Sequence, residues 1–79
     1  MQSILGIDVS KKTLDVVLLK DLSRQHKIFK NESTGYQQLQ GWLLSCQAGC
    51  VHACLEATGQ YGDGVADYLY AEHHQVSVV

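Results

Sequence analysis

Two acidic residues stand at the ends of otherwise apolar segments and are the first candidates for chemistry. Asp8 lies near the end of the run 4–9, and Glu56 directly follows the short apolar run 51–55. A carboxylate in such a segment is costly unless it meets a cation or hydrogen-bond donors, because a buried, unpaired charge loses its hydration. Gly6 would share a strand face with Asp8, so no side chain crowds the carboxylate there. Both acids are therefore candidates for cation binding.

The chemistry depends on whether the two acids meet. If their segments are adjacent parallel strands, Asp8 and Glu56 are neighbours at the carboxyl edge of the sheet, where ligands bind in open α/β folds. Two close carboxylates repel each other unless a cation lies between them, and Mg²⁺ takes carboxylate oxygens while keeping several waters. Two such ions about 3.5–4 Å apart can activate a nucleophile and stabilise a leaving oxygen at a phosphate. The alternatives stay open: Asp8 as a turn cap and Glu56 as an acid favoured at a helix N-terminus.

Other polar residues have simpler structural explanations. Ser10 and Thr58 fit turn capping better than phosphate contact. Asp15 would lie on the opposite strand face from its apolar neighbours and is interpreted as structural. His52 would share a strand face with Glu56, which makes it a weaker candidate for supporting a metal ligand. The pair His73-His74 ends a helical pattern and is interpreted as a solvated helix end.

Three cysteines are evenly spaced along the chain: Cys46, Cys50 and Cys54. Their C-x3-C-x3-C spacing would suit metal binding from one continuous helix, but Gly49 interrupts it. Buried or half-buried free thiols are therefore favoured over a zinc site. An odd cysteine count without a secretion signal also argues against a disulfide framework.

Hydrophobic periodicity predicts the elements that position these residues. Strands are expected near residues 3–9, 13–20, 25–31, 51–56 and 75–79, and helices near 34–48 and 60–72. Trp42 and Tyr68 stand at helical spacing with apolar residues and are expected in the core. The first strand is almost wholly apolar, which predicts cover on both of its faces. The order β-β-β-α-β-α-β predicts an α/β fold with a mixed sheet, because the first three strands have connections too short for a crossover.

Composition and charge limit the classes of protein to which this chain could belong. The chain has 79 residues, a size that fits one domain or part of one, and its net charge of −2 by itself implies no affinity for nucleic acid. All six basic residues precede residue 31, however. They either guard an edge strand or form a face that touches a phosphate backbone. No apolar run approaches the length of a membrane span and the N-terminus does not read as a signal peptide, so a cytoplasmic protein without membrane contact is expected.

Two motifs carry a resemblance to a known family. Residues 6–16 read GIDVSKKTLDV, residues 55–61 read LEATGQY, and residues 31–35, before the first predicted helix, read NESTG. Together they resemble the N-terminal part of DEDD-type insertion-sequence transposases, a family that includes pilin-type DNA invertases and recombinases guided by a bridging RNA. The resemblance extends over essentially all 79 residues.

The resemblance implies a RuvC-like (RNase H-like) fold in which the strands lie in the order third, second, first, fourth, fifth. It also implies an Asp-Glu-Asp-Asp site in which Asp8 is the first and Glu56 the second catalytic, metal-binding carboxylate. Mg²⁺ or Mn²⁺ would be the cofactor of the full-length protein. DNA would be the partner, together with a guide RNA in part of the family. The two later aspartates, and a C-terminal domain with a nucleophilic serine, would lie beyond Val79.

Two other classes of protein remain open at this stage. Actin-like ATPases and sugar kinases also begin with a strand, an Asp, a tight turn and a second strand. They usually have a glycine two residues after that Asp, where this chain has Ser10. A non-enzymatic interaction module is the third possibility.

The chain also stops within an apolar strand, at residues 75–79. We therefore expect the N-terminal part of a longer domain, inactive as a recombinase because half of the metal ligands are missing. We also expect this part to self-associate through its fifth strand or an uncovered face of the sheet.

Overall fold

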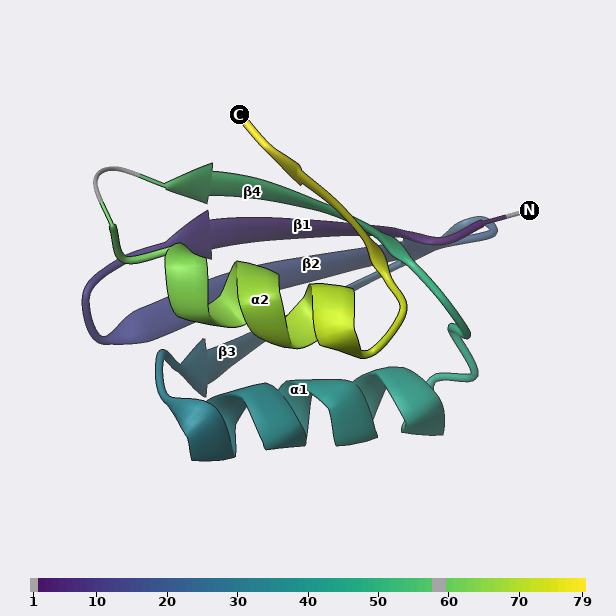
Figure 1. The fold of residues 1–79 in the computed structure, drawn as a ribbon. Helices are drawn as coiled ribbons and strands as arrows, with labels where there is room; N and C mark the ends of the chain where they lie inside the picture. The colour runs from purple at the N-terminus through teal and green to yellow at the C-terminus, as the bar shows by residue number, and fades with distance from the viewer. Residues whose placement is uncertain (1, 58–59) are drawn as a thin grey trace.

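A computed structural model describes residues 2–57 and 60–79 and has the element order expected from the sequence (Figure 1). The elements follow one another as β1 (Ile4–Val9), β2 (Thr13–Lys20), β3 (Ser23–Lys30), α1 (Ser33–Ser45), β4 (His52–Ala57), α2 (Asp63–Ala71) and β5 (Gln75–Val78). All seven predicted elements are present, and their bounds differ from the predicted ones by at most three residues. The fold class is confirmed as α/β.

The five strands form one mixed sheet in the order β3-β2-β1-β4-β5. The pairs β1–β2 and β2–β3 are antiparallel, whereas β1–β4 and β4–β5 are parallel. Tight turns join the first three strands, while a helix precedes β4 and another precedes β5, as parallel crossovers require. The predicted strand order is therefore confirmed, and the strand that carries Asp8 lies at the centre of the sheet.

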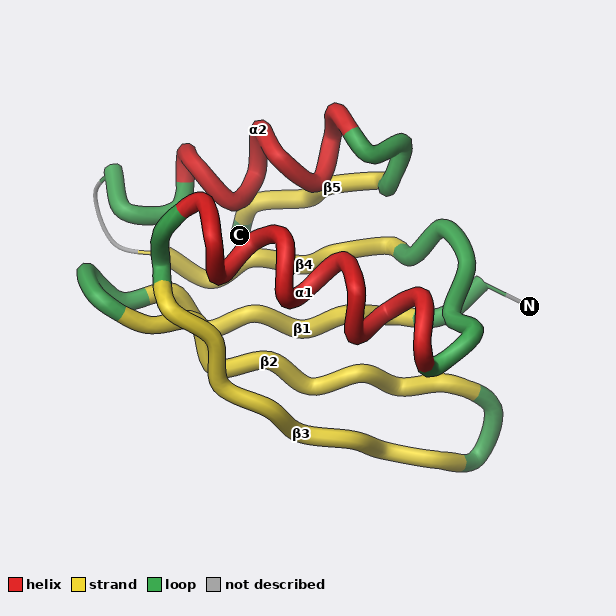
Figure 2. Tube along the Cα trace, turned by 90° about the horizontal axis from the view of Figure 1, so that it is seen from below, coloured by secondary structure: helices red, strands yellow, loops and turns green. Residues whose placement is uncertain are grey.

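Both helices pack against the same face of the sheet (Figures 1 and 2). The core between the two layers consists mainly of fully or almost fully buried aliphatic side chains: Leu5, Ile7, Val9, Leu14, Val16, Leu18, Phe29, Leu39, Leu43, Ala48, Val51, Ala53, Leu55, Val65 and Leu69. Trp42 and Tyr68 are half-buried and pack against this core, as expected. Among the described residues, neither α1 nor α2 is long and apolar enough to cross a membrane.

No element of residues 2–57 and 60–79 covers the opposite face of the sheet, so the uncovered face expected for this part of the domain is present. We call it the open face; it carries Ile4, Gly6 and Asp8 of β1. Side chains alternate along a strand, so Leu5 and Ile7 point to the helices while Ile4, 45% exposed, points away from them. Apolar residues on both sides of β1 are the pattern that predicted cover on two faces, and within the described residues the helices supply this cover on one face.

Two residues after each helix stands a non-glycine residue in the left-handed region, Gln47 with φ 56° and His73 with φ 70°. After α2, the backbone N–H of His74 donates to the carbonyl of Leu69 (3.1 Å) and that of His73 to the carbonyl of Tyr70 (3.0 Å). These two bonds turn the chain back toward the sheet. The helices therefore end earlier than the periodicity predicted.

His74 corrects the interpretation of His73-His74 as a solvated helix end, because its side chain is buried while that of His73 is exposed. The Nδ1 atom of His74 accepts from the backbone N–H of Val51 (2.9 Å), and its Nε2 donates to Oε1 of Gln40 (2.8 Å). Burial lowers the pKa of the imidazole; nearby Glu72 acts in the opposite direction, and His73 adds to the lowering. His74 is thus a neutral core residue that joins the start of β4 to α1.

Candidate functional site

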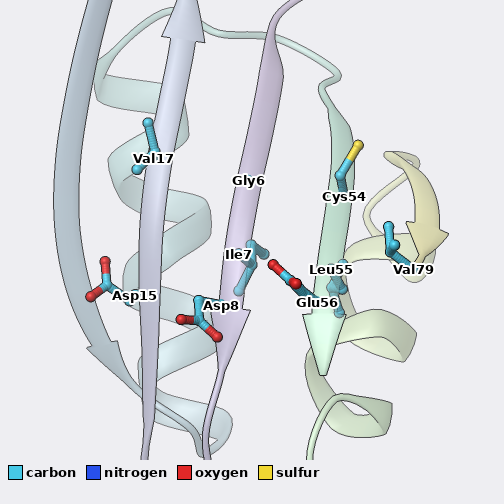
Figure 3. Close-up of a pocket in the computed structure, with 9 residues that line it drawn as sticks. All are labelled: Gly6, Ile7, Asp8, Asp15, Val17, Cys54, Leu55, Glu56 and Val79. Carbon is cyan, nitrogen blue, oxygen red and sulfur yellow. The ribbon is translucent and has the colours of Figure 1, made fainter. Parts of the chain in front are cut away.

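The two predicted site acids lie side by side on the open face. Asp8 and Glu56 are register partners on the adjacent parallel strands β1 and β4, and both are exposed. Figure 3 shows Glu56 extending from β4 toward β1, with the carboxylate of Asp8 beside β1. Because both strands run in the same direction, the two acids stand at the same carboxyl edge of the sheet. The condition for their meeting, that their strands are adjacent and parallel, is therefore fulfilled.

An open hollow surrounds the pair (Figure 3). Its lining comes from β1, β2, β4 and the end of the chain: Gly6, Ile7, Asp8, Asp15, Val17, Cys54, Leu55, Glu56 and Val79. A Cβ atom built on Gly6 would meet nothing closer than the carbonyl oxygen of Val17, at 4.0 Å. The absence of a side chain at this position leaves the approach to Asp8 free, as the sequence indicated.

Asp15 extends the acidic pair into a row across three strands. It is the antiparallel register partner of Asp8, and it lines the same hollow. Its carboxylate lies within hydrogen-bond distance of Nε2 of His26, and both side chains are about half exposed. Figure 3 shows Asp15 turned away from Asp8, consistent with a partner on β3. The contact with His26 agrees with a structural role, but the position of Asp15 beside Asp8 was not predicted from the sequence. The three-residue turn between β1 and β2 could have predicted this pairing, because the length of the turn sets the register of the two strands.

The remaining polar candidates have roles that do not involve the hollow. Oγ of Ser10 lies within hydrogen-bond distance of the Thr13 carbonyl (3.1 Å) and accepts from the Thr13 N–H (3.2 Å), so its predicted turn role is confirmed. His52 pairs with Oγ of Ser77 (2.7 Å) at the start of β4. Four strand residues, or about 13 Å, separate it from Glu56, so it gives that carboxylate no direct support. Thr58 lies outside the described residues.

All three cysteines are free thiols, and Cys46 and Cys54 are half-buried as expected. Cys50 is exposed, which corrects the expectation of a buried or half-buried thiol at this position. Cys54 lines the hollow beside Glu56. Cys46 lies just after α1, and its carbonyl accepts a hydrogen bond from Nζ of Lys20 (2.9 Å). Within the described residues, no group of three or more His, Cys, Asp and Glu side chains is arranged to hold a metal ion.

The acidic pair fits part of a divalent-metal site. Within residues 2–57 and 60–79, neither Asp8 nor Glu56 forms an ion pair that would compensate its charge. Like charges on directly paired residues destabilise a sheet, so a cation that bound between them would relieve this repulsion. Carboxylate oxygens are the ligands that Mg²⁺ and Mn²⁺ take, and Mg²⁺ is commonly held by one or two protein carboxylates plus water and phosphate oxygens.

Asn31 joins the loops that border this edge of the sheet. Its Nδ2 donates to the carbonyls of Ser10 (2.8 Å) and Tyr61 (2.9 Å), and its Oδ1 accepts from the hydroxyl of Tyr36 (2.6 Å). Its backbone N–H donates to the carbonyl of Lys12 (2.9 Å). One residue therefore connects the β1–β2 turn, the start of α1 and the segment after β4. Partial burial raises the pKa of the Tyr36 hydroxyl, so this donor stays protonated at neutral pH.

Comparison with solved structures defines the fold class. The whole chain superimposes on 64% of the Thermus thermophilus RuvC chain in a complex with a Holliday junction substrate, with a TM-score of 0.67 and 10% sequence identity. It also superimposes on 44% of the YeaZ chain from Pseudomonas aeruginosa, with a TM-score of 0.62 and 16% identity. At such low identities the superpositions establish a common fold, RuvC-like and therefore RNase H-like, and nothing about activity.

The family follows from the sequence. Residues 5–79 match the profile of the DEDD-type, IS110-type family described as "Transposase". The chain belongs to this family. It is also 31% identical over 77 residues to the pilin gene-inverting proteins of Moraxella bovis and of Moraxella lacunata. The match includes 95% of this chain and 24% of each relative, so the chain spans about a quarter of the length of these relatives. Membership of this family favours the transposase over the ATPase alternative.

Proposed function

We propose that this chain is the N-terminal part of the RuvC-like domain of a DNA recombinase of the transposase class. In this proposal the recombinase acts on DNA phosphodiesters with a divalent metal, Mg²⁺ or Mn²⁺. The observation that supports it most directly is the pairing of Asp8 with Glu56 on adjacent parallel strands at one edge of the sheet, in a chain of the DEDD family. The RuvC chain of similar fold is described with a Holliday junction substrate, which is a DNA, and this likeness supports DNA as the partner.

In this proposal Asp8 and Glu56 are two metal-binding carboxylates of a larger catalytic site. The central strand β1 fixes the position of Asp8, and the parallel pairing with β4 fixes the position of Glu56 beside it. A bound divalent cation would supply activation of a nucleophile and stabilisation of a leaving oxygen at a phosphate. The family pattern has four carboxylates, so the two remaining acids, the nucleophile and any guide-RNA contact would come from other parts of the protein. The 79 residues alone would then be inactive in strand exchange.

The metal assignment can be tested on this chain with Mn²⁺, whose paramagnetism broadens the NMR signals of nearby amides. We expect weak binding, in the millimolar range, with broadening centred on residues 6–9 and 54–57. Asp8→Asn and Glu56→Gln should each abolish this localised broadening, since each removes one of two charged oxygen donors. Asp67→Asn, at an exposed position of α2, removes the same charge elsewhere and serves as the control.

Broadening that survives both substitutions, or that is centred on another part of the chain, would rule out this metal site. In a recombination-competent protein that contains this segment, Asp8→Asn should lower strand exchange by at least about 100-fold, as expected for the loss of a group that stabilises the transition state. Intact strand exchange in that variant would contradict a catalytic role.

A further inference from the structure

Three of the six basic residues gather at the edge of the sheet that carries the acidic pair. Lys11 and Lys12 form the β1–β2 turn and Lys30 ends β3. They line one hollow together with Thr13, Asn31 and Glu32. We call Lys11, Lys12 and Lys30 the lysine cluster. All three are exposed, and within residues 2–57 and 60–79 none of them forms an ion pair. Glu32, the acid of the hollow, accepts a hydrogen bond from Oγ1 of Thr34 (2.8 Å).

The register of the sheet places the lysine cluster beside the acidic pair. Lys30 is the register partner of Thr13, which stands two residues from Asp15 and so shares its face, the open face. Lys11 follows Asp8 by three residues, at most about 11 Å along an extended chain. DNA carries one phosphate per about 3.4 Å of each strand, so a strand lying on the lysine cluster would pass the acidic pair within about three phosphates.

Protection of an exposed edge strand, the simpler explanation for surface lysines, does not account for this cluster. It could apply to Lys30, because β3 lies at an edge of the sheet. Lys11 and Lys12, however, belong to the turn between β1, the central strand, and β2, where no edge needs protection. Asn31 also holds this turn through the carbonyls of Ser10 and Lys12, so the ammonium groups extend from a backbone that is fixed before any ligand binds.

We propose that the lysine cluster binds the phosphodiester backbone of a DNA strand and leads it across the open face to Asp8 and Glu56. The inference rests on the proposed function for the identity of the partner. The binding measurements are made in EDTA, without any divalent metal. Their outcome therefore tests the DNA contact of the lysine cluster separately from the proposed metal site. Contacts from lysine to phosphate carry no sequence information, so the cluster would position DNA without selecting its sequence.

The test compares two variants with the same net charge. The first removes the lysine cluster by Lys11→Gln, Lys12→Gln and Lys30→Gln. The control removes the other three basic residues by Lys20→Gln, Arg24→Gln and Lys27→Gln. Fluorescence anisotropy with a labelled 16-base-pair duplex, and with one of its strands, gives the affinity between about 20 and 150 mM salt.

Three phosphate contacts predict that log K falls against log salt with a slope of about −2.7 for the duplex and about −2.1 for the single strand. The variant without the lysine cluster should lose this slope and bind at least about tenfold more weakly at 50 mM salt. The control variant should keep the slope and most of the affinity. Equal weakening in both variants would mean that net charge, and not the lysine cluster, attracts DNA, and would overturn the proposal.

Two further measurements locate the bound strand. Addition of DNA to the unmodified chain should shift the NMR signals of residues 10–13 and 30–31. In EDTA the acidic pair repels a phosphate that passes it, so Asp8→Asn with Glu56→Gln should raise the affinity several-fold, but only where the lysine cluster is intact. No detectable binding by the unmodified chain at 20 mM salt, or shifts confined to other segments, would sink the proposal.

Discussion

At the scale of single residues, the same chemical type serves different purposes according to its environment. Asp8 and Glu56 are exposed acids without an ion-pair partner in the described part of the chain, whereas the carboxylate of Asp15 is within hydrogen-bond distance of His26 on β3. Among the histidines, His26 is exposed and faces an acid, while His74 is buried and accepts a backbone N–H. Burial and partners, and not residue type, separate the candidate site from the residues that support the fold.

The environment of His74 leads to a prediction about pH. Burial lowers its pKa in the folded chain, whereas in the unfolded chain the pKa returns to about 6.5. The unfolded state therefore binds more protons below about pH 6.5, so the contribution of His74 to stability is present above that pH and is lost as the pH falls. The slope from one such group is at most about 1.4 kcal/mol per pH unit.

Urea denaturation between pH 7.5 and 5 measures this effect. His74→Gln should lower stability at pH 7.5 by about 1–3 kcal/mol, because the Val51 N–H loses its acceptor, and should remove part of the pH dependence. His73→Gln changes an exposed neighbour and should keep the dependence of the unmodified chain. The assignment is wrong if His74→Gln and His73→Gln have the same pH dependence.

At the scale of elements, the position of α1 depends on one close approach. A Cβ atom built on Gly35 would lie 1.8 Å from the carbonyl oxygen of Lys30, so only glycine allows the first turn of α1 to pass the end of β3. This approach also places Asn31 between the two elements, where it holds the β1–β2 turn. The packing of α1 is therefore coupled to the geometry of the edge that carries the lysine cluster and the acidic pair.

Two glycine substitutions in α1 test this coupling. Gly35→Ala should lower the free energy of unfolding by about 2–3 kcal/mol or more, because the backbone must shift to admit a methyl group. Gly41→Ala, where a Cβ atom would meet nothing within 4 Å, should instead raise it by about 0.5–1 kcal/mol through the better helix propensity of alanine. The comparison uses urea midpoints. Similar effects of the two substitutions would show that the contact at Lys30 is not limiting.

At the scale of the whole molecule, this is a two-layer structure with one layer of helices and one bare sheet face. The open face carries partly exposed apolar side chains among its acids, including Ile4 (45%), Leu19 (45%) and Ile28 (57%). The strand β5 forms one edge of the sheet, and Val78 within it is 65% exposed. Exposed apolar faces and unpaired edges are surfaces that associate with other chains.

We therefore expect the 79-residue chain to self-associate, with the open face as the main contact. Sedimentation velocity at tens of micromolar should show dimers or larger species whose proportion rises with concentration. Leu19→Lys with Ile28→Lys should shift the chain toward monomer. Leu22→Lys with Leu44→Lys, two exposed positions in the hairpin turn and on α1, adds the same charge and should leave the association unchanged. A monomer with no concentration dependence would contradict this expectation.

The sequence alone determined the elements, and its resemblance to a known family predicted their order in the sheet and the meeting of Asp8 with Glu56. Periodicity and short turns specify local structure, and the resemblance to the family implied the strand order, which places the strands of Asp8 and Glu56 side by side. Only the tertiary structure decided which face of β1 is bare, that His74 is buried, that Asp15 extends the acidic row, and that Asn31 holds Lys11 and Lys12 near Lys30. These features depend on contacts between residues far apart in the chain, which local patterns do not specify because a side chain's environment is set by the elements that pack around it.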